Sequence, residues 1–288
     1  MVAYLQPLVW GLDDLRRVII PGSSKSDTHQ AQIQLAVKPQ HPESGGMDHS
    51  MSESGGSSRK RATLNHHEAL RAIFIDFEGT EKDPASFLGY WCEGTWEVAL
   101  LEPCLEPAAH YPHRLGSLHV SSSVEVCRRL QDRAVREDRR IVAWSSRELI
   151  EILAIDELTS DEKNWWETNL FNALPPAKAW ARRVGTEIPA IPGKRGKEFN
   201  KWSLSGFRKA TGYPDIAALF EPGTTASRIR YVRGQLAKRG DFTALTPVAK
   251  RKWVNVLTHN FHDCAGLAHV VSTVFADVSP VQSLNRTS

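Results

Sequence analysis

The stretch AIFIDFEGTEK, residues 72–82, combines an apolar run with two carboxylates. The run Ala72–Phe77 is rich in branched and aromatic side chains, which predicts a buried strand. Residues i and i+2 of a strand point to the same face, so Asp76 and Glu78 project together, about 6.5–7 Å apart at Cα. Buried strands rarely hold ionised groups without a compensating partner. The stretch therefore predicts a strand that carries a charged site near its end.

Two interpretations of this pair of acids stay open from the stretch alone. Neighbouring carboxylates raise each other's pKa unless a cation lies between them. A divalent metal supplies such a cation, and hard oxygen ligands suit Mg²⁺ or Mn²⁺. The alternative is a strand end at which Asp76 and Glu78 reach solvent or the N-termini of helices.

Further strands follow this stretch and predict an α/β fold. Residues 86–91 and 95–102 are two more strand-like runs, joined by a tight hairpin at 92–94. A fourth strand fits residues 139–144. We expect the first three strands to form an antiparallel meander, with the fourth returning parallel to the first in a mixed sheet.

Helices fill the remaining positions of this pattern. One fits residues 121–138, and another begins after Ser145 or Ser146 with Glu148 in its first turn. The element order is then β-β-β-α-β-α, followed by a mainly helical C-terminal half. Helices are predicted there near residues 161–184, 203–211, 224–239 and 247–275.

The ends of the chain differ in composition from this folded part. Residues 1–65 are predicted to be a poorly ordered extension, because 22–65 is rich in Gly, Ser, His, Gln and Pro and lacks an apolar period. The folded domain is expected over 66–280, with a flexible tail over 281–288. No apolar run approaches the ~20 residues of a membrane helix, and the four Cys form no CxxC pair. We therefore expect a cytoplasmic protein with reduced thiols.

The net charge of +3 hides an uneven distribution. Residues 178–252 hold 17 Lys and Arg against 5 Asp and Glu, a local balance of +12 that leaves −9 for the rest of the chain. A basic half beside an acidic site suits a polyanionic ligand held near metal-binding carboxylates. A solvated basic surface is the alternative. We expect nucleic acid as the partner, and no membrane.

A late helical segment, VLTHNFHDCAGLAHVV over 256–271, adds two polar residues with a defined spacing. His259 and Asp263 are i and i+4, so they share one face of the helix. They could form a local ion pair, or they could present one metal ligand and one general base. His262 points about 100° away on the helix and is expected to be structural.

Together these features resemble the DEDD 3′–5′ exonuclease superfamily, which has the ribonuclease H-like fold. Over residues 70–275 the chain is similar to a branch of predicted bacterial nucleases, some of which are fused to RecB-type or helicase modules. IFIDFEGT resembles its first motif, WSSRE over 144–148 its second, and HNFHDC over 259–264 its last. His259 stands where that branch has Tyr, and NKWSLSGFRKATGY over 200–213 resembles the segment before the last helix.

The resemblance implies a metal-dependent nuclease that hydrolyses phosphodiester bonds, with 3′–5′ exonuclease activity on single strands. Asp76, Glu78, Glu148 and Asp263 would hold two Mg²⁺ or Mn²⁺ ions, and His259 would act as general base. A helicase or RecB-type partner is implied by the resemblance alone. The alternative is a catalytically inactive ribonuclease H-like module that binds nucleic acid or another partner.

Contacts to the phosphate backbone are expected from the basic half of the chain. Trp202 and Phe207 could stack on unpaired bases or be core residues of a helix. The candidates for nucleic-acid binding are Lys194, Arg195, Lys197, Lys201, Trp202 and Arg208.

Overall fold

The computed structural model describes residues 63–80, 83–109, 116–190, 202–214 and 224–276. All of them belong to the second of two units into which the chain divides after Arg61. The predicted extension over 1–65 lies outside the described residues except for its last three positions, and the predicted tail over 281–288 lies outside them entirely.

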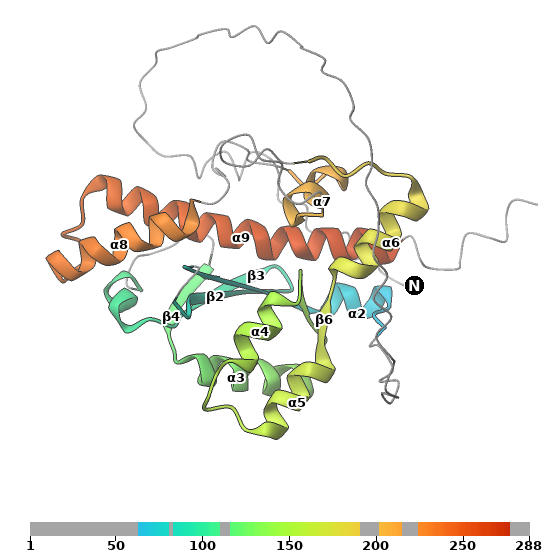
Figure 1. The fold of residues 1–288 in the computed structure, drawn as a ribbon, viewed down its shortest axis with the longest axis horizontal. Helices are drawn as coiled ribbons and strands as arrows, with labels where there is room; N and C mark the ends of the chain where they lie inside the picture. Colours follow the sequence, from blue (N-terminus) through green and yellow to red (C-terminus); the bar gives the residue numbers. More distant parts are fainter. Residues whose placement is uncertain (1–62, 81–82, 110–115, 191–201, 215–223, 277–288) are drawn as a thin grey trace, which may run out of the picture. The chain divides into compact units, whose positions relative to one another are not determined.

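A mixed six-stranded sheet with the order β4-β3-β2-β1-β5-β6 runs through these residues (Figure 1). β2 is antiparallel to both β1 and β3, and β5 is parallel to β1, which confirms the predicted meander and returning strand. The α/β fold with a mixed sheet is therefore confirmed. The strands are β1 (Ile73–Gly79), β2 (Ala85–Cys92), β3 (Thr95–Leu100), β4 (Gly116–Val120), β5 (Ile141–Ala143) and β6 (Leu170–Asn172).

Two strands are absent from the sequence prediction. β4 adds to the free edge of β3, and β6 adds to β5, both in parallel. The single helix predicted over 161–184 is wrong, because β6 separates α5 (Ser160–Asn169) from α6 (Leu174–Val184). The sequence marks this break, since Pro175 and Pro176 lack N–H donors and are tolerated only in the first turn of a helix.

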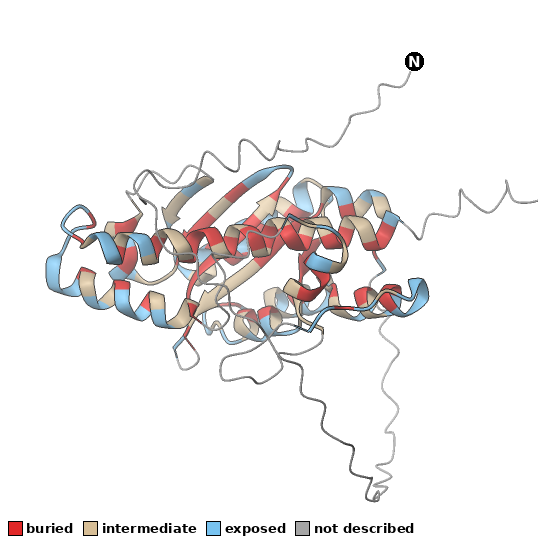
Figure 2. Cartoon of the chain, turned by 90° about the horizontal axis from the view of Figure 1, so that it is seen from above, coloured by how far each residue is buried: buried red, intermediate tan, exposed pale blue. Residues whose placement is uncertain are grey.

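Helices cover both faces of the sheet (Figure 1). One face packs against α3 (Ser123–Arg136), α4 (Arg147–Leu153) and α5. The long helix α9 (Pro247–Ala276) crosses the other face, and Figure 2 shows buried positions along most of its length. Beside α9 lie α2 (His66–Arg71), α6, α7 (Leu204–Ala210), α8 (Thr225–Arg239) and the short 3₁₀ helix η1 (Pro103–Ala108).

The alternation along β1 assigns its side chains to the two faces. Ile73 and Ile75 join the hydrophobic cluster under α3 and α5, whereas Phe74 joins a cluster under α9. Asp76 and Glu78 follow Phe74 at i+2 and i+4, so they project toward α9. The acids therefore lie on the face that α9 crosses.

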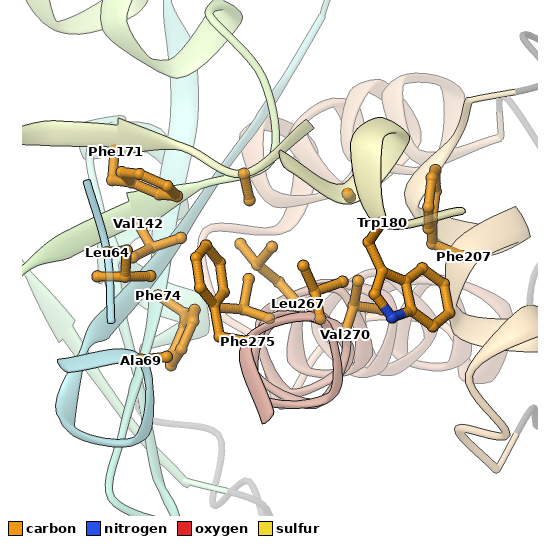
Figure 3. Close-up of a cluster of buried hydrophobic side chains, with 14 of the residues drawn as sticks. Leu64, Ala69, Phe74, Val142, Phe171, Trp180, Phe207, Leu267, Val270 and Phe275 are labelled. Carbon is orange, nitrogen blue, oxygen red and sulfur yellow. The ribbon is translucent and has the colours of Figure 1, made fainter. Parts of the chain in front are cut away.

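Two hydrophobic clusters hold α9 on this face. The cluster shown in Figure 3 joins Phe74 of β1 to Leu267 and Val270 in the second half of α9. The other joins Trp96 of β3 to Trp253 in the first half of α9. Because both halves of the helix are anchored, its middle is held in place over β1.

Three smaller expectations are also answered by the described residues. The β2–β3 hairpin turns through Glu93 and Gly94 with φ of 49° and 84°, the left-handed geometry of a two-residue turn. All four Cys are free thiols. No helix in the described ranges is both long and apolar enough to cross a membrane.

Candidate metal centre

Three separate elements bring the four predicted acids to one edge of the sheet. Asp76 and Glu78 lie near the end of β1, and Glu148 lies in the first turn of α4, directly after β5. β1 and β5 are parallel, so their ends meet at the same edge. Asp263 comes from the middle of α9. The carboxylates of Glu78, Asp263 and Glu148 all raise the pKa of Asp76, so the three groups lie within electrostatic range of Asp76.

Two of these acids and a histidine are close enough to share an ion. Glu78, His259 and Asp263 offer ligand atoms that all lie within 4.8 Å of one another. His259 Nε2 is 3.7 Å from Glu78 Oε1 and 3.3 Å from Asp263 Oδ2. The group could therefore hold a metal ion. Among the described residues, Asp76 and Glu148 are not members of this closest group.

Three carboxyl groups of the site, those of Asp76, Glu78 and Glu148, are costly to ionise in the absence of a cation. Burial, and then the neighbouring carboxylates, raise the pKa of Asp76 well above its ordinary value. Burial raises the pKa of Glu78 to about 7, although His259 and Arg147 oppose the shift. Burial also raises the pKa of Glu148. A bound cation would relieve this cost, which is the behaviour expected of metal ligands.

Asp76 is positioned by a buried amide on α9. Asn260 Nδ2 donates to Asp76 Oδ2 at 2.8 Å and to the Asp76 main-chain oxygen at 3.1 Å. The Asn260 carbonyl in turn accepts from Trp96 Nε1 at 3.2 Å. Asn260 is fully buried against β2, where a Cβ on Gly89 would lie 1.6 Å from its Oδ1. Only glycine at position 89 leaves room for the amide.

Asp263 is positioned differently, by a buried cation on α7. Arg208 Nη1 donates to Asp263 Oδ1 at 2.5 Å and to the His262 main-chain oxygen at 3.0 Å. A Cβ on Gly266 would lie 2.2 Å from Arg208 Cδ, so glycine at this position leaves room for the arginine side chain against α9. The prediction that Arg208 is a surface contact for phosphate is therefore corrected, because its side chain is buried and bound to an acid of the site.

Glu148 is positioned by the turn that precedes α4. Its Oε2 accepts from Ser145 Oγ at 3.0 Å and from the Ser145 main-chain nitrogen at 3.3 Å. Ser146 occupies the cap position without a capping hydrogen bond from its side chain. Glu148 therefore faces inward from the first turn of its helix, and it is buried.

The predicted nucleic-acid-binding residues and His262 differ in where the structure places them. Lys194, Arg195, Lys197 and Lys201 lie outside the described residues. Trp202 is half-buried and stacks on Phe207, with 6.0 Å between the ring centroids. Lys178 Nζ lies 5.5 Å from the centroid of the Trp202 ring. Phe207 is a core residue. The expected structural role of His262 is consistent with its burial and its 3.0 Å contact with the Tyr213 hydroxyl.

Asn260, Gly89 and Gly266 are residues of the site that the sequence prediction misses. Asn260 lies inside the last motif, directly after His259, but motif spacing alone gives it no partner. Gly89 carries a usable signal, because glycine inside a strand often marks the close approach of another group. Gly266 carries the weaker signal of a glycine inside a helix.

A scan of protein-family models finds no match to the chain, and no curated protein matches it. The function is therefore inferred from the residues of the site and their geometry.

Proposed function

We propose that the chain is a metal-dependent nuclease with a ribonuclease H-like fold that hydrolyses phosphodiester bonds, acting as a 3′–5′ exonuclease on single-stranded nucleic acid. The observation that carries this proposal is the meeting of Asp76, Glu78, Glu148 and Asp263 at one sheet edge, where the other three carboxylates raise the pKa of Asp76.

The order of the strands supports the fold part of the proposal. Within the sheet, β3-β2-β1-β5-β6 combines an antiparallel meander with two parallel strands, and β4 is an addition at one edge. The acids come from the first strand, from the helix after β5 and from the last long helix. This is the placement that the resemblance to the DEDD superfamily implies.

The donor set fits divalent cations. The four carboxylates would hold two Mg²⁺ or Mn²⁺ ions, which when bound lower the pKa of the attacking water and stabilise the leaving 3′-oxygen. In the reaction the water oxygen bonds to phosphorus as the bond from phosphorus to the 3′-oxygen breaks, and that oxygen receives a proton. Two roles fit an imidazole at the position of His259: accepting the proton of the water, or binding a metal.

Cleavage of end-labelled oligonucleotides tests the proposal. The full chain is incubated with 5′- and 3′-labelled single-stranded DNA and RNA, with Mg²⁺ or Mn²⁺. We expect a ladder from the 5′ label and early release of a labelled mononucleotide from the 3′ label. Asp76→Asn should lower the rate by about 10³-fold or more with the fold retained, since a carboxylate of the site is lost.

The control for this variant is Arg136→Gln. The Arg136 side chain is exposed on α3, the helix on the opposite face of the sheet from the site. This control should cleave at the wild-type rate. No metal-dependent cleavage of any substrate by the wild type, or an unchanged rate in Asp76→Asn, contradicts the proposal.

A binding module without catalysis is the second candidate, and the α8–α9 hairpin favours it. Residues 225–252 carry eight Lys and Arg and one acid, Asp241. Such a surface would bind a phosphate backbone with an affinity that falls steeply with salt. Salt-dependent binding of oligonucleotides without any cleavage would select this candidate.

A further inference from the structure

We propose that His259 binds the metal directly rather than serving as the proton acceptor, so that Glu78, His259 and Asp263 form a mixed nitrogen–oxygen centre that prefers transition-metal ions such as Mn²⁺ and Co²⁺ to Mg²⁺. The inference rests on the metal centre of the proposed function. It requires no substrate, and it can be tested with the metal ions alone.

The distances around the imidazole fit a shared ion. Ligand atoms about 2.0–2.2 Å from one ion are about 2.8–3.1 Å apart at right angles and about 3.3–3.6 Å apart at the tetrahedral angle. His259 Nε2 lies 3.3 Å from Asp263 Oδ2 and 3.7 Å from Glu78 Oε1. The distance to Asp263 lies within the tetrahedral range and the distance to Glu78 is just above it, so the nitrogen stands close to ligand spacing from both carboxylates.

The arrangement of the elements also suits metal binding. His259 and Asp263 are one helical turn apart on α9, the i and i+4 spacing with which one helix face supplies two ligands to one ion. Glu78 supplies the third ligand from β1. Because both halves of α9 are packed into hydrophobic clusters, the two elements that bring these ligands together are fixed.

The hydrogen bonds of the acids engage one carboxylate oxygen each, and the other oxygen stays available as a metal ligand. Arg208 occupies Asp263 Oδ1, so Oδ2, which faces His259, remains as the ligand atom. Asn260 and Ser145 likewise hold one oxygen each of Asp76 and Glu148. Such supporting contacts orient the ligands of metal sites and tune their affinity.

The chemistry of the donors sets the expected preference. Mg²⁺ is a hard cation that favours an all-oxygen set, whereas imidazole favours first-row transition metals. Affinity for a given site rises from Mn²⁺ to Co²⁺ along that row. An imidazole at ligand spacing therefore shifts the centre away from Mg²⁺ more strongly than a site of carboxylates alone would.

In the competing explanation, His259 only pairs with the two carboxylates and does not bind the metal. Spectroscopy of the metal-loaded protein distinguishes the two explanations. Co²⁺ is added to the full chain, and its d–d absorption reports the ligand set. Pulsed electron paramagnetic resonance of the Mn²⁺-loaded wild type reports coupling to an imidazole nitrogen. This second measurement needs no variant, so it remains decisive if a substitution at residue 259 prevents folding.

Calorimetric titration with Mn²⁺, Co²⁺ and Mg²⁺ gives the affinities. We expect the wild type to bind Mn²⁺ about tenfold or more tightly than Mg²⁺. His259→Gln should weaken Mn²⁺ and Co²⁺ binding by about 10–100-fold and change the Co²⁺ spectrum, with a much smaller effect on Mg²⁺. The control His67→Gln, on the exposed surface of α2, should match the wild type.

The possible outcomes keep this inference separate from the proposed function. Wild-type Mn²⁺ affinity, an unchanged Co²⁺ spectrum in His259→Gln and no nitrogen coupling would overturn the inference even if the protein cleaves nucleic acid. Nitrogen coupling that disappears in His259→Gln would support it even if no cleavage occurs, and in that case only the proposed nuclease activity fails.

Discussion

Asp76 and Asp263 face the same site, but the protein supports them in different ways. Asp76 receives hydrogen bonds from a neutral amide, that of Asn260. Asp263 is paired with the guanidinium of Arg208, which is 2 % exposed. The amide orients its acid without adding charge, whereas the arginine also supplies a positive charge in a buried setting. Asp263 thus has a cationic partner within the fold, whereas the amide that supports Asp76 is neutral.

The largest effect should come from breaking the charged support. Arg208→Met leaves Asp263 without its buried partner, and removing one member of such a pair costs about 3–5 kcal/mol of the free energy of unfolding. Chemical denaturation without metal measures this loss. Added Mn²⁺ should recover part of it, because the ion would supply the missing charge. A variant as stable as the wild type would show that the pair contributes little.

Breaking the neutral support should cost less. Asn260→Ala removes the donor to Asp76 and an acceptor for Trp96, a loss of about 1–3 kcal/mol by chemical denaturation. The hydrogen bond from Asn260 lowers the pKa of Asp76, so its loss should raise that pKa further and weaken Mn²⁺ binding at neutral pH. A loss as large as that of Arg208→Met would contradict the difference between the two supports.

Glycine substitutions within helices sharpen the same comparison. In Gly266→Ala the new Cβ would meet Arg208 Cδ at 2.2 Å, so we expect about 1–3 kcal/mol of destabilisation from overpacking. In the control Gly234→Ala, on α8, the Cβ meets nothing within 4 Å, and the higher helix propensity of Ala should stabilise by up to about 1 kcal/mol. Thermal unfolding of both variants measures the contrast, and shifts of the same sign would refute it.

A further effect should be a dependence of metal-free stability on pH. The pKa of Glu78 is about 7 in the folded chain, against an ordinary 4.5. Between these values the folded state holds more protons than the unfolded state, so this group lowers the free energy of unfolding as pH rises from 4.5 to 7. We expect a fall of several degrees in melting temperature.

Glu78→Gln isolates this contribution. The variant cannot ionise at position 78, so its melting temperature should fall less across the same pH range than that of the wild type. Saturating Mn²⁺ should likewise reduce the fall for the wild type, since the ion stabilises the ionised form. Equal slopes in variant and wild type would exclude Glu78 as the cause.

The sequence predicts the fold where the signal is local. The apolar run Ala72–Phe77 and the turn at Glu93 and Gly94 depend on near neighbours, and both match the structure. The three residues of β6 are too few for a period to be recognised, so the sequence prediction merges this short strand with the helices on either side. Its parallel pairing with β5 comes from tertiary contacts, which no local pattern encodes.

The same distinction applies to the site. Asp76 and Glu78 can be recognised as a pair because strand geometry fixes their common face. Arg208 could not be assigned, because a basic residue in a basic segment looks like a surface contact until α7 is placed against α9. Its role is set by a partner 55 residues away, and spacing along the chain does not reveal such a pairing.

The position of α9 over β1 has a consequence for local unfolding, in which α9 would detach from the sheet. Asp76 and Asn260 are 184 residues apart in the chain, and Glu78 is nearly as far from His259. An ion shared by Glu78, His259 and Asp263 would close a loop of most of the domain. α9 could then leave the sheet only if the ion lost its bond to Glu78 or its bonds to both His259 and Asp263. Loading the centre would therefore slow amide hydrogen exchange in β1 and in the middle of α9 together. In the proposed nuclease, one ion would thus also join α9 to the first strand.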